Sequence, residues 1–177
     1  FPNNFMPTDG IAISPDGRFA YVANTLSDDV TVIRTGDHEV VATIPAAAGA
    51  HLPALSSDGR YGYVANFAAD SLTAWDCRTH QVVATIPVGI YPHFFAPSPD
   101  GKWLVVSNTG ESSICIIDAH QHAPLARLLV GGAPAHIGFS PDGELAFVGC
   151  ESSDEVAVVD LRRQSVVELT RAGTTLQ

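Results

Sequence analysis

The chain has 177 residues and a formal net charge of −10, from 9 Lys and Arg against 19 Asp and Glu. A surface of this sign repels phosphate backbones and anionic lipid, so it argues against nucleic acid and membrane surfaces as partners. Apolar residues make up 46% of the chain, enough for a real core. No apolar run reaches the ~18 residues of a membrane span, so membrane insertion is not expected.

A short turn recurs at a fixed spacing along the whole chain. Ser14-Pro15-Asp16-Gly17 returns after each step of 42 residues, and four such repeats account for 168 of the 177 residues. The three later copies are Ser56-Ser57-Asp58-Gly59, Ser98-Pro99-Asp100-Gly101 and Ser140-Pro141-Asp142-Gly143. Glycine tolerates the positive φ of such tight turns, so the repeated unit predicts a repeated hairpin.

Each repeat predicts four short strands in chain order. The first follows a loop containing Gly and Pro, as at 94–96 and 137–139. The second follows the turn and is rich in β-branched and aromatic residues, which favour strands; its copies are 19–24, 61–66, 103–108 and 145–150. Copies of the third strand are 30–33, 72–75, 114–117 and 156–159, and those of the fourth are 39–44, 81–86, 126–130 and 165–169.

Four antiparallel strands in a repeat of about 40 to 45 residues are typical of a β-propeller blade. The apolar residues recur every second position or run continuously, which excludes a helical repeat. The sequence therefore predicts an all-β chain, 1–177, that is one β-propeller domain or a propeller segment. The expected blades are roughly 10–45, 52–87, 94–130 and 136–170.

The blade count of the complete ring stays open at this point. Four blades can close a ring by themselves, two chains can form an eight-bladed homo-oligomer, or a longer parent chain can supply about seven blades. An open arc would expose an apolar face at each end, and such faces drive association.

The segment 14–24, Ser-Pro-Asp-Gly-Arg-Phe-Ala-Tyr-Val-Ala-Asn, resembles the YVTN-type β-propeller repeat. All four repeats match it in part, with departures at Ser57 in place of Pro and at Cys150 in place of Asn. The resemblance implies a bacterial or archaeal protein that is periplasmic, at the cell surface or extracellular. Surface-layer proteins are one such class. The resemblance implies no reaction, because the same architecture serves scaffolds, sugar-ring lactonases and haem- or copper-bearing redox enzymes.

Histidines gather on the loops where propellers usually bind ligands. His51 and His93 share one repeat position, 42 residues apart, and His136 lies one place later. Three imidazoles pointing into one channel suit a transition metal or a haem iron, or a general base. Asp9 and Tyr91 lie near the same position and complete the candidate set. The alternative is a structural role, in which each histidine bonds a backbone carbonyl and packs against its neighbour.

Several other polar residues are expected to be structural. Asn24, Asn66 and Asn108 end the second strand and are predicted to bond the local backbone. Asp76, Asp118 and Asp160 end the third strand and are predicted to cap a turn. The remaining histidines fall in the turn before the fourth strand, on the opposite face, and are discounted; they are His38, His80, His120 and His122.

The cysteines Cys77, Cys115 and Cys150 include no Cys-x-x-Cys pair, so their spacing excludes a zinc knuckle and favours buried free thiols. No nucleophile elbow, phosphate loop, dinucleotide fingerprint or zinc-protease motif occurs.

We therefore expect a non-enzymatic binding or interaction module with no cofactor, which takes a protein or small-molecule ligand on the loop face. The alternative is a redox or hydrolytic enzyme domain with a metal or haem held by His51, His93 and His136.

Overall fold

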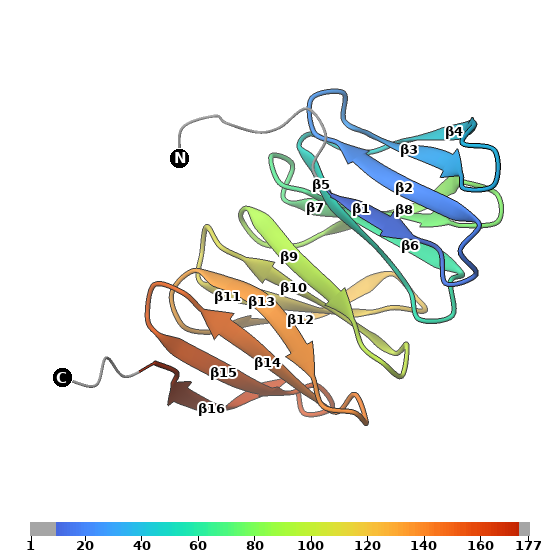
Figure 1. Ribbon diagram of the computed structural model, residues 1–177. Coiled ribbons are helices and arrows are strands. Elements are labelled where there is room, and N and C mark those ends of the chain that lie inside the picture. The colour runs from blue at the N-terminus through green and yellow to red at the C-terminus, as the bar shows by residue number, and fades with distance from the viewer. Residues whose placement is uncertain (1–9, 174–177) are drawn as a thin grey trace. The chain divides into compact units, whose positions relative to one another are not determined.

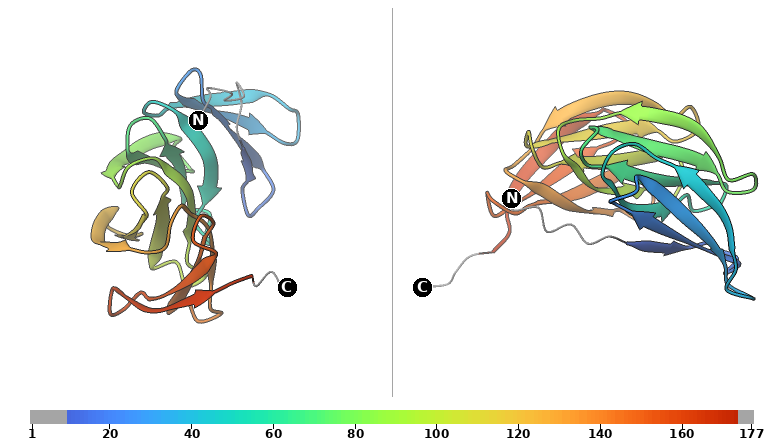
Figure 2. Two further views of the ribbon diagram at one scale, coloured as in Figure 1. Left: turned by 90° about the vertical axis from the view of Figure 1, so that its left-hand side faces the viewer. Right: turned by 90° about the horizontal axis from the view of Figure 1, so that it is seen from above.

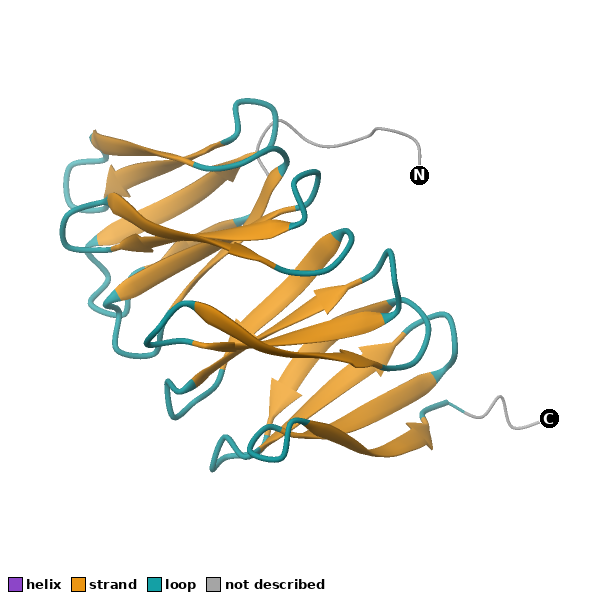
Figure 3. Ribbon diagram, turned by 180° about the vertical axis from the view of Figure 1, so that it is seen from behind, coloured by secondary structure: helices purple, strands orange, loops and turns teal. Residues whose placement is uncertain are grey.

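The computed structural model describes residues 10–173, and all regular secondary structure in that range is β-strand (Figures 1 and 3). The strands form four antiparallel four-stranded sheets, each in sequential order, which confirms the predicted fold class. No helix in the described range is long and apolar enough to cross a membrane.

The first two sheets lie in one compact unit, which ends at Pro87. One sheet contains β1 (Ile11–Ile13), β2 (Phe19–Asn24), β3 (Asp29–Arg34) and β4 (Val40–Pro45). The other contains β5 (Ala50–Leu55), β6 (Tyr61–Asn66), β7 (Ser71–Asp76) and β8 (Gln81–Pro87). Tyr21, Val30, Val64 and Trp75 belong to the shared core of this unit and are fully buried.

A second compact unit begins at Val88 and has the same construction. One of its sheets contains β9 (Pro92–Pro97), β10 (Trp103–Asn108), β11 (Ser113–Asp118) and β12 (Ala123–Leu129). The other contains β13 (Pro134–Phe139), β14 (Leu145–Cys150), β15 (Glu155–Asp160) and β16 (Ser165–Arg171). Ile114, Ile116, Val148 and Val159 form part of its core. Figure 2 shows the twist within each sheet that is normal for antiparallel strands.

The recurring Ser-x-Asp-Gly turn joins the first and second strands of every sheet. In the first copy Ser14 Oγ donates to Asp16 Oδ1 at 2.6 Å, and the same oxygen accepts the N–H of Arg18 at 3.0 Å. Ser14 Oγ in turn accepts the N–H of Phe19 at 2.9 Å, and Gly17 has φ of 71°. The copies at Ser56, Ser98 and Ser140 have the same bonds.

A β-bulge recurs between the third and fourth strands of every sheet. In the first sheet Val32 faces Ala42 but Ile33 faces Val40, so Val41 has no partner across the ladder. The matching residues of the other sheets are spaced by the 42-residue repeat; they are Val83, Leu125 and Val167. Each extra residue bends the outermost strand and increases its local twist.

Candidate functional site

The candidate histidines lie at irregularities in the first strand of their sheets. In β5 the register shifts between His51 and Pro53. In β9 the bulged residue is His93, which has no partner across the ladder, because Pro92 faces Asn108 and Phe94 faces Ser107. His136 lies inside the irregular stretch of β13. A bulge re-aims the side chains around it, so the same repeat position has a different surrounding in each sheet.

The three histidines differ in burial and contacts. His51 is 6% exposed, His93 is half-buried and His136 is exposed. In the second unit the Phe94 ring lies against both histidines, with ring centroids 4.5 Å from His93 and 4.1 Å from His136. Within residues 10–173 no group of three His, Cys, Asp or Glu side chains is placed to hold a metal ion. Asp9 lies outside the described residues, and the proposed histidine site stays a prediction.

The loop before β9, residues 88–91, is held by hydrogen bonds at four consecutive residues. Arg127 Nη2 donates to the Val88 carbonyl at 2.6 Å, and the Gly89 N–H donates to Asn108 Oδ1 at 3.0 Å. The next two carbonyls accept backbone N–H groups, Ile90 from Gly110 and Tyr91 from Thr109, each at 3.0 Å. The Thr109 hydroxyl also donates to the Tyr91 carbonyl at 3.0 Å. These bonds tie the loop to the loop after β10 and to β12.

Tyr91 itself has a left-handed backbone, with φ of 54°, and its residue is 49% exposed. The equivalent residues of the neighbouring repeats are Gly49, with φ of 78°, and Ala133, with φ of 48°. A bulky residue in this conformation costs about 1 kcal/mol or more relative to glycine. Burial does not offset that cost, because Tyr91 and its neighbour Ile90 are both about half exposed.

The asparagines have the structural role that the sequence predicts. Asn66 Oδ1 accepts the N–H of Ala47 at 3.2 Å, and its Nδ2 donates to Ser71 Oγ and Thr73 Oγ1 at 3.0 Å each. Asn108 makes the matching bonds to Gly89 and Ser113. These side chains tie the loop before the first strand to the second and third strands.

Two further repeat positions have left-handed backbones that the sequence analysis did not foresee. One lies in the loop before the third strand and the other in the turn before the fourth. Asp, Asn and His are enriched in this conformation, which explains why those residue types recur there. The first set is Asp28, Asp70, Ser112 and Asp154, and the second is His38, His80, His122 and Gln164.

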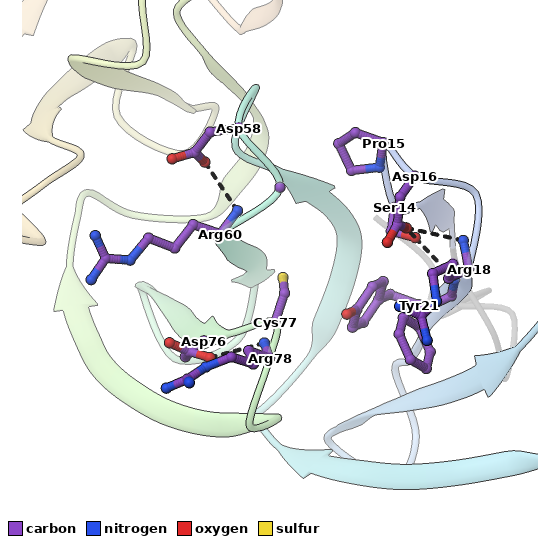
Figure 4. A pocket seen from close by; sticks show the side chains of 12 residues that line it. Ser14, Pro15, Asp16, Arg18, Tyr21, Asp58, Arg60, Asp76, Cys77 and Arg78 are labelled. Atoms are coloured by element: carbon purple, nitrogen blue, oxygen red, sulfur yellow. Dashed lines mark hydrogen bonds between the residues drawn. The ribbon is translucent and has the colours of Figure 1, made fainter.

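A pocket of about 730 Å³ lies in the first unit (Figure 4). We call it the arginine pocket. Its walls come from the turns after β1, β5 and β7 and from the start of β2. The lining residues are Ser14, Pro15, Asp16, Arg18, Phe19, Tyr21, Asp58, Gly59, Arg60, Asp76, Cys77 and Arg78. The sequence analysis missed this site, although Arg18 and Arg60 follow the recurring turn at the 42-residue spacing.

Residues 8–176 match the YNCE-like β-propeller family. The chain belongs to this family. The propeller architecture predicted from the repeat is thereby confirmed, while the finer assignment to the YVTN type and to surface layers stays a prediction. None of the curated proteins compared matches the chain in sequence.

Two solved structures resemble this chain in three dimensions. Hydrazine synthase of Kuenenia stuttgartiensis is 25% identical, with a TM-score of 0.83 over 96% of this propeller chain and 50% of that one. The periplasmic gluconolactonase of Pseudomonas aeruginosa is 21% identical, with a TM-score of 0.75 over 94% of this chain and 54% of that one. The chain thus spans about half the length of these structures, and the second likeness shows the fold alone.

Proposed function

We propose that the chain is a non-enzymatic binding module that captures a protein partner through the 88–91 loop, with Tyr91 as the anchor. The observation that supports this function is the strained and exposed Tyr91, at a position where the two neighbouring repeats have Gly49 and Ala133. Backbone strain that burial does not offset is typical of ligand-binding positions.

The composition of the loop agrees with this role. Its equivalents read Ala46-Ala47-Ala48-Gly49 and Val130-Gly131-Gly132-Ala133, whereas this copy reads Val88-Gly89-Ile90-Tyr91. Of these three copies only this one has a large apolar pair, while the first repeat has Phe5-Met6 at 4–7. Tyrosine is enriched at the centres of protein interfaces, because it combines a large apolar ring with a polar tip. The hydrogen bonds at all four residues keep the loop ordered before binding, which lowers the entropic cost of association.

Photo-crosslinking tests the proposal. A benzophenone amino acid is placed at Tyr91 or, as a matched aromatic control in the same unit, at Phe147, which is 40% exposed. Each protein is irradiated in an envelope extract of the source organism. We expect a discrete adduct from position 91 that unlabelled wild-type chain competes away and the Tyr91→Ala chain does not. Equal adducts from both positions, or none from position 91, would refute the proposed function.

The location and the complete assembly belong to the same proposal. We propose a periplasmic, cell-surface or extracellular location, as the YVTN resemblance implies. We also propose that further blades, from a second copy or from a longer parent chain, act together with these four, since the matched solved structures are about twice as long.

Native mass spectrometry of the purified chain distinguishes a dimer from a single copy. The same spectrum tests the alternative function, because a bound metal or haem would add mass that His93→Ala removes.

A further inference from the structure

The two sheets of each unit pack against each other through two different apolar faces. In the first unit the sheet β1–β4 contributes Tyr21, Val30 and Val32 to the core. The sheet β5–β8 contributes Val64 and Trp75 to the same core, and all five side chains are fully buried. The second unit repeats this contact with the residues at the same repeat positions, which are Val105, Ile114, Ile116, Val148 and Val159.

The last sheet, β13–β16, has the first of these two faces exposed. Phe147, Val156 and Val158 stand at the repeat positions of the residues that β1–β4 contributes to its core. Phe147 faces Val158 across the β14–β15 ladder, so their side chains lie on one side of the sheet. Phe147 is 40% exposed and both valines are partly exposed. We call this surface, formed by Phe147, Val156 and Val158, the β14 face.

The first sheet, β1–β4, has the second of these two faces exposed. Val22 and Ile33 stand at the repeat positions of the two residues that β5–β8 contributes to its core, and both are partly exposed. Ile11 pairs with Val22 across the ladder, and Ile13 points to the same side. Ile11 is 62% exposed and Ile13 is 53% exposed, whereas Phe139, at the repeat position of Ile13, packs against the core of the second unit. We call the surface formed by Ile11, Ile13, Val22 and Ile33 the β1 face.

We propose that two copies of this chain form a dimer in which the β14 face of each copy packs against the β1 face of the other. The two faces repeat the two surfaces that meet inside each unit, so they match each other as those surfaces do. Exposed apolar faces of this kind drive association, and a contact between two unlike faces can close into a symmetric dimer. A second copy also supplies the length that is needed, because the matched solved structures are about twice as long as this chain.

The outer strand of the β14 face favours a separate copy over a further sheet of the same chain. Glu168 and Thr170 pair with the two valines of this face, so they lie on its outer margin, and both are exposed. At the same repeat positions of the first unit, Ala42 and Ile44 belong to an apolar contact that reaches the outer strand. An apolar centre with a polar rim is typical of interfaces between separate molecules.

The dimer rests on the proposal above that further blades act together with these four. It commits to a second copy as their source and names the faces that meet. It does not depend on partner binding by the 88–91 loop, and the two are tested separately.

The repeat also predicts which residues meet between the copies. In the first unit the Tyr21 and Trp75 rings pack with centroids 5.5 Å apart. Their equivalents on the two exposed faces are Phe147 and Ile33. We therefore expect Phe147 of one copy to lie against Ile33 of the second copy.

A benzophenone amino acid at position 147 tests this contact in the purified chain. Irradiation should give an adduct of twice the chain mass of 18.6 kDa. Trypsin cuts after Arg18 and Arg34, and the crosslink should lie on the peptide 19–34 of the second copy. This adduct contains no other protein, so its mass distinguishes it from the partner adduct for which position 147 is the control. A crosslink between two copies that lies on the peptide carrying position 147 itself would contradict the pairing of unlike faces.

Face variants test the pairing by native mass spectrometry. We expect the wild-type chain to be a dimer at about 10 µM. Ile11→Glu places a charge on the β1 face and Phe147→Glu places one on the β14 face. Each should raise the Kd of the dimer about 100-fold or more and give monomers, because every contact needs one face of each kind. Leu26→Glu is the matched control, since Leu26 is 71% exposed in the loop between β2 and β3, and it should stay dimeric.

Mixing the two face variants distinguishes this pairing from a contact between like faces. The Ile11→Glu chain keeps an intact β14 face, and the Phe147→Glu chain keeps an intact β1 face. The mixture should therefore recover a dimer with one copy of each variant, through a single wild-type contact. The recovered dimer also shows that both variants are folded.

Four results would overturn the proposal. A wild-type chain that is monomeric at about 100 µM would exclude the second copy, and binding of an apolar dye by that monomer would leave the faces to further sheets of a longer chain. A dimer that persists in either glutamate variant would show that its face is not used. Equal loss of the dimer in Leu26→Glu would indicate a general charge effect. A mixture of the two face variants that stays monomeric would exclude the pairing of unlike faces. None of these results changes the adduct expected at position 91.

Discussion

Asn66→Ala is expected to destabilise the first unit strongly. Asn66 is 0% exposed at the end of β6, and it connects the loop before β5 with two hydroxyls of β7. Alanine keeps the Cβ atom of the asparagine but has no side-chain hydrogen-bond donor or acceptor. The N–H of Ala47 and the hydroxyls of Ser71 and Thr73 would then lose their common partner.

The expected loss follows from the three hydrogen bonds. At about 1 kcal/mol for each bond, the free energy of unfolding should fall by about 3 kcal/mol. Asn24→Ala is the matched comparison in the same unit. Asn24 also donates to two side chains, Asp29 at 2.7 Å and Thr31 at 2.8 Å, but it is only half-buried. Water can replace part of what is lost there, so we expect about 1 kcal/mol.

Urea unfolding measures both variants in a Trp103→Phe background, where fluorescence comes from Trp75 in the core of the first unit. The midpoint should move at least twice as far for Asn66→Ala as for Asn24→Ala, with the slope of the transition unchanged. Equal shifts would contradict the reasoning, because they would mean that burial of this amide contributes nothing.

Three further changes test other features of the fold. Tyr91→Gly should raise the stability of the second unit by about 1 kcal/mol in urea unfolding, because glycine relieves the left-handed backbone at φ of 54°; a loss of stability would show that the ring packs more than its exposure indicates. Gly62→Ala should destabilise the first unit by about 2 kcal/mol or more, because its Cβ would collide with the Trp75 indole, whereas Gly36→Ala meets open space and should be nearly neutral in thermal melting. The pKa of Asp58 is lowered in the folded state by the Ser56 hydroxyl and the Arg60 N–H. The carboxylate therefore stabilises the fold above its unfolded pKa of 3.8, and this stabilisation is lost as the pH falls through its folded pKa. Asp58→Asn should therefore flatten the fall of the melting temperature at about pH 4 and below, and a fall as steep as that of the wild type would rule this contribution out.

The repeat made the fold predictable, because its turn and its asparagine mark both ends of the second strand. The ranges 19–24, 61–66 and 103–108 agree with β2, β6 and β10. The fourth strand was less predictable in the third repeat, where 126–130 was expected and β12 covers Ala123–Leu129. Pro124 stands near the start of this strand only in the third repeat, and because proline is atypical of strands, the sequence pattern starts too late there.

The candidate site was only partly accessible from sequence. Tyr91 was among the expected residues, but its left-handed backbone becomes visible only in three dimensions. The histidines share a repeat position, yet the bulge falls on a different residue in each first strand, so their exposure differs. The arginine pocket is lined by turns from two sheets. Tyr21 and Cys77 are far apart in the sequence, so no local sequence pattern predicts that both line it.

The bulges at Val41, Val83, Leu125 and Val167 have a consequence for self-association. The fourth strand is the outer edge of each sheet, where unpaired backbone groups can recruit a strand from another molecule. Three of the four bulged residues are apolar side chains that are 41 to 50% exposed, which would favour cross-β stacking on a flat edge. The extra residue breaks the regular ladder at the same place in every sheet, so the edges make poor templates for amyloid-like growth.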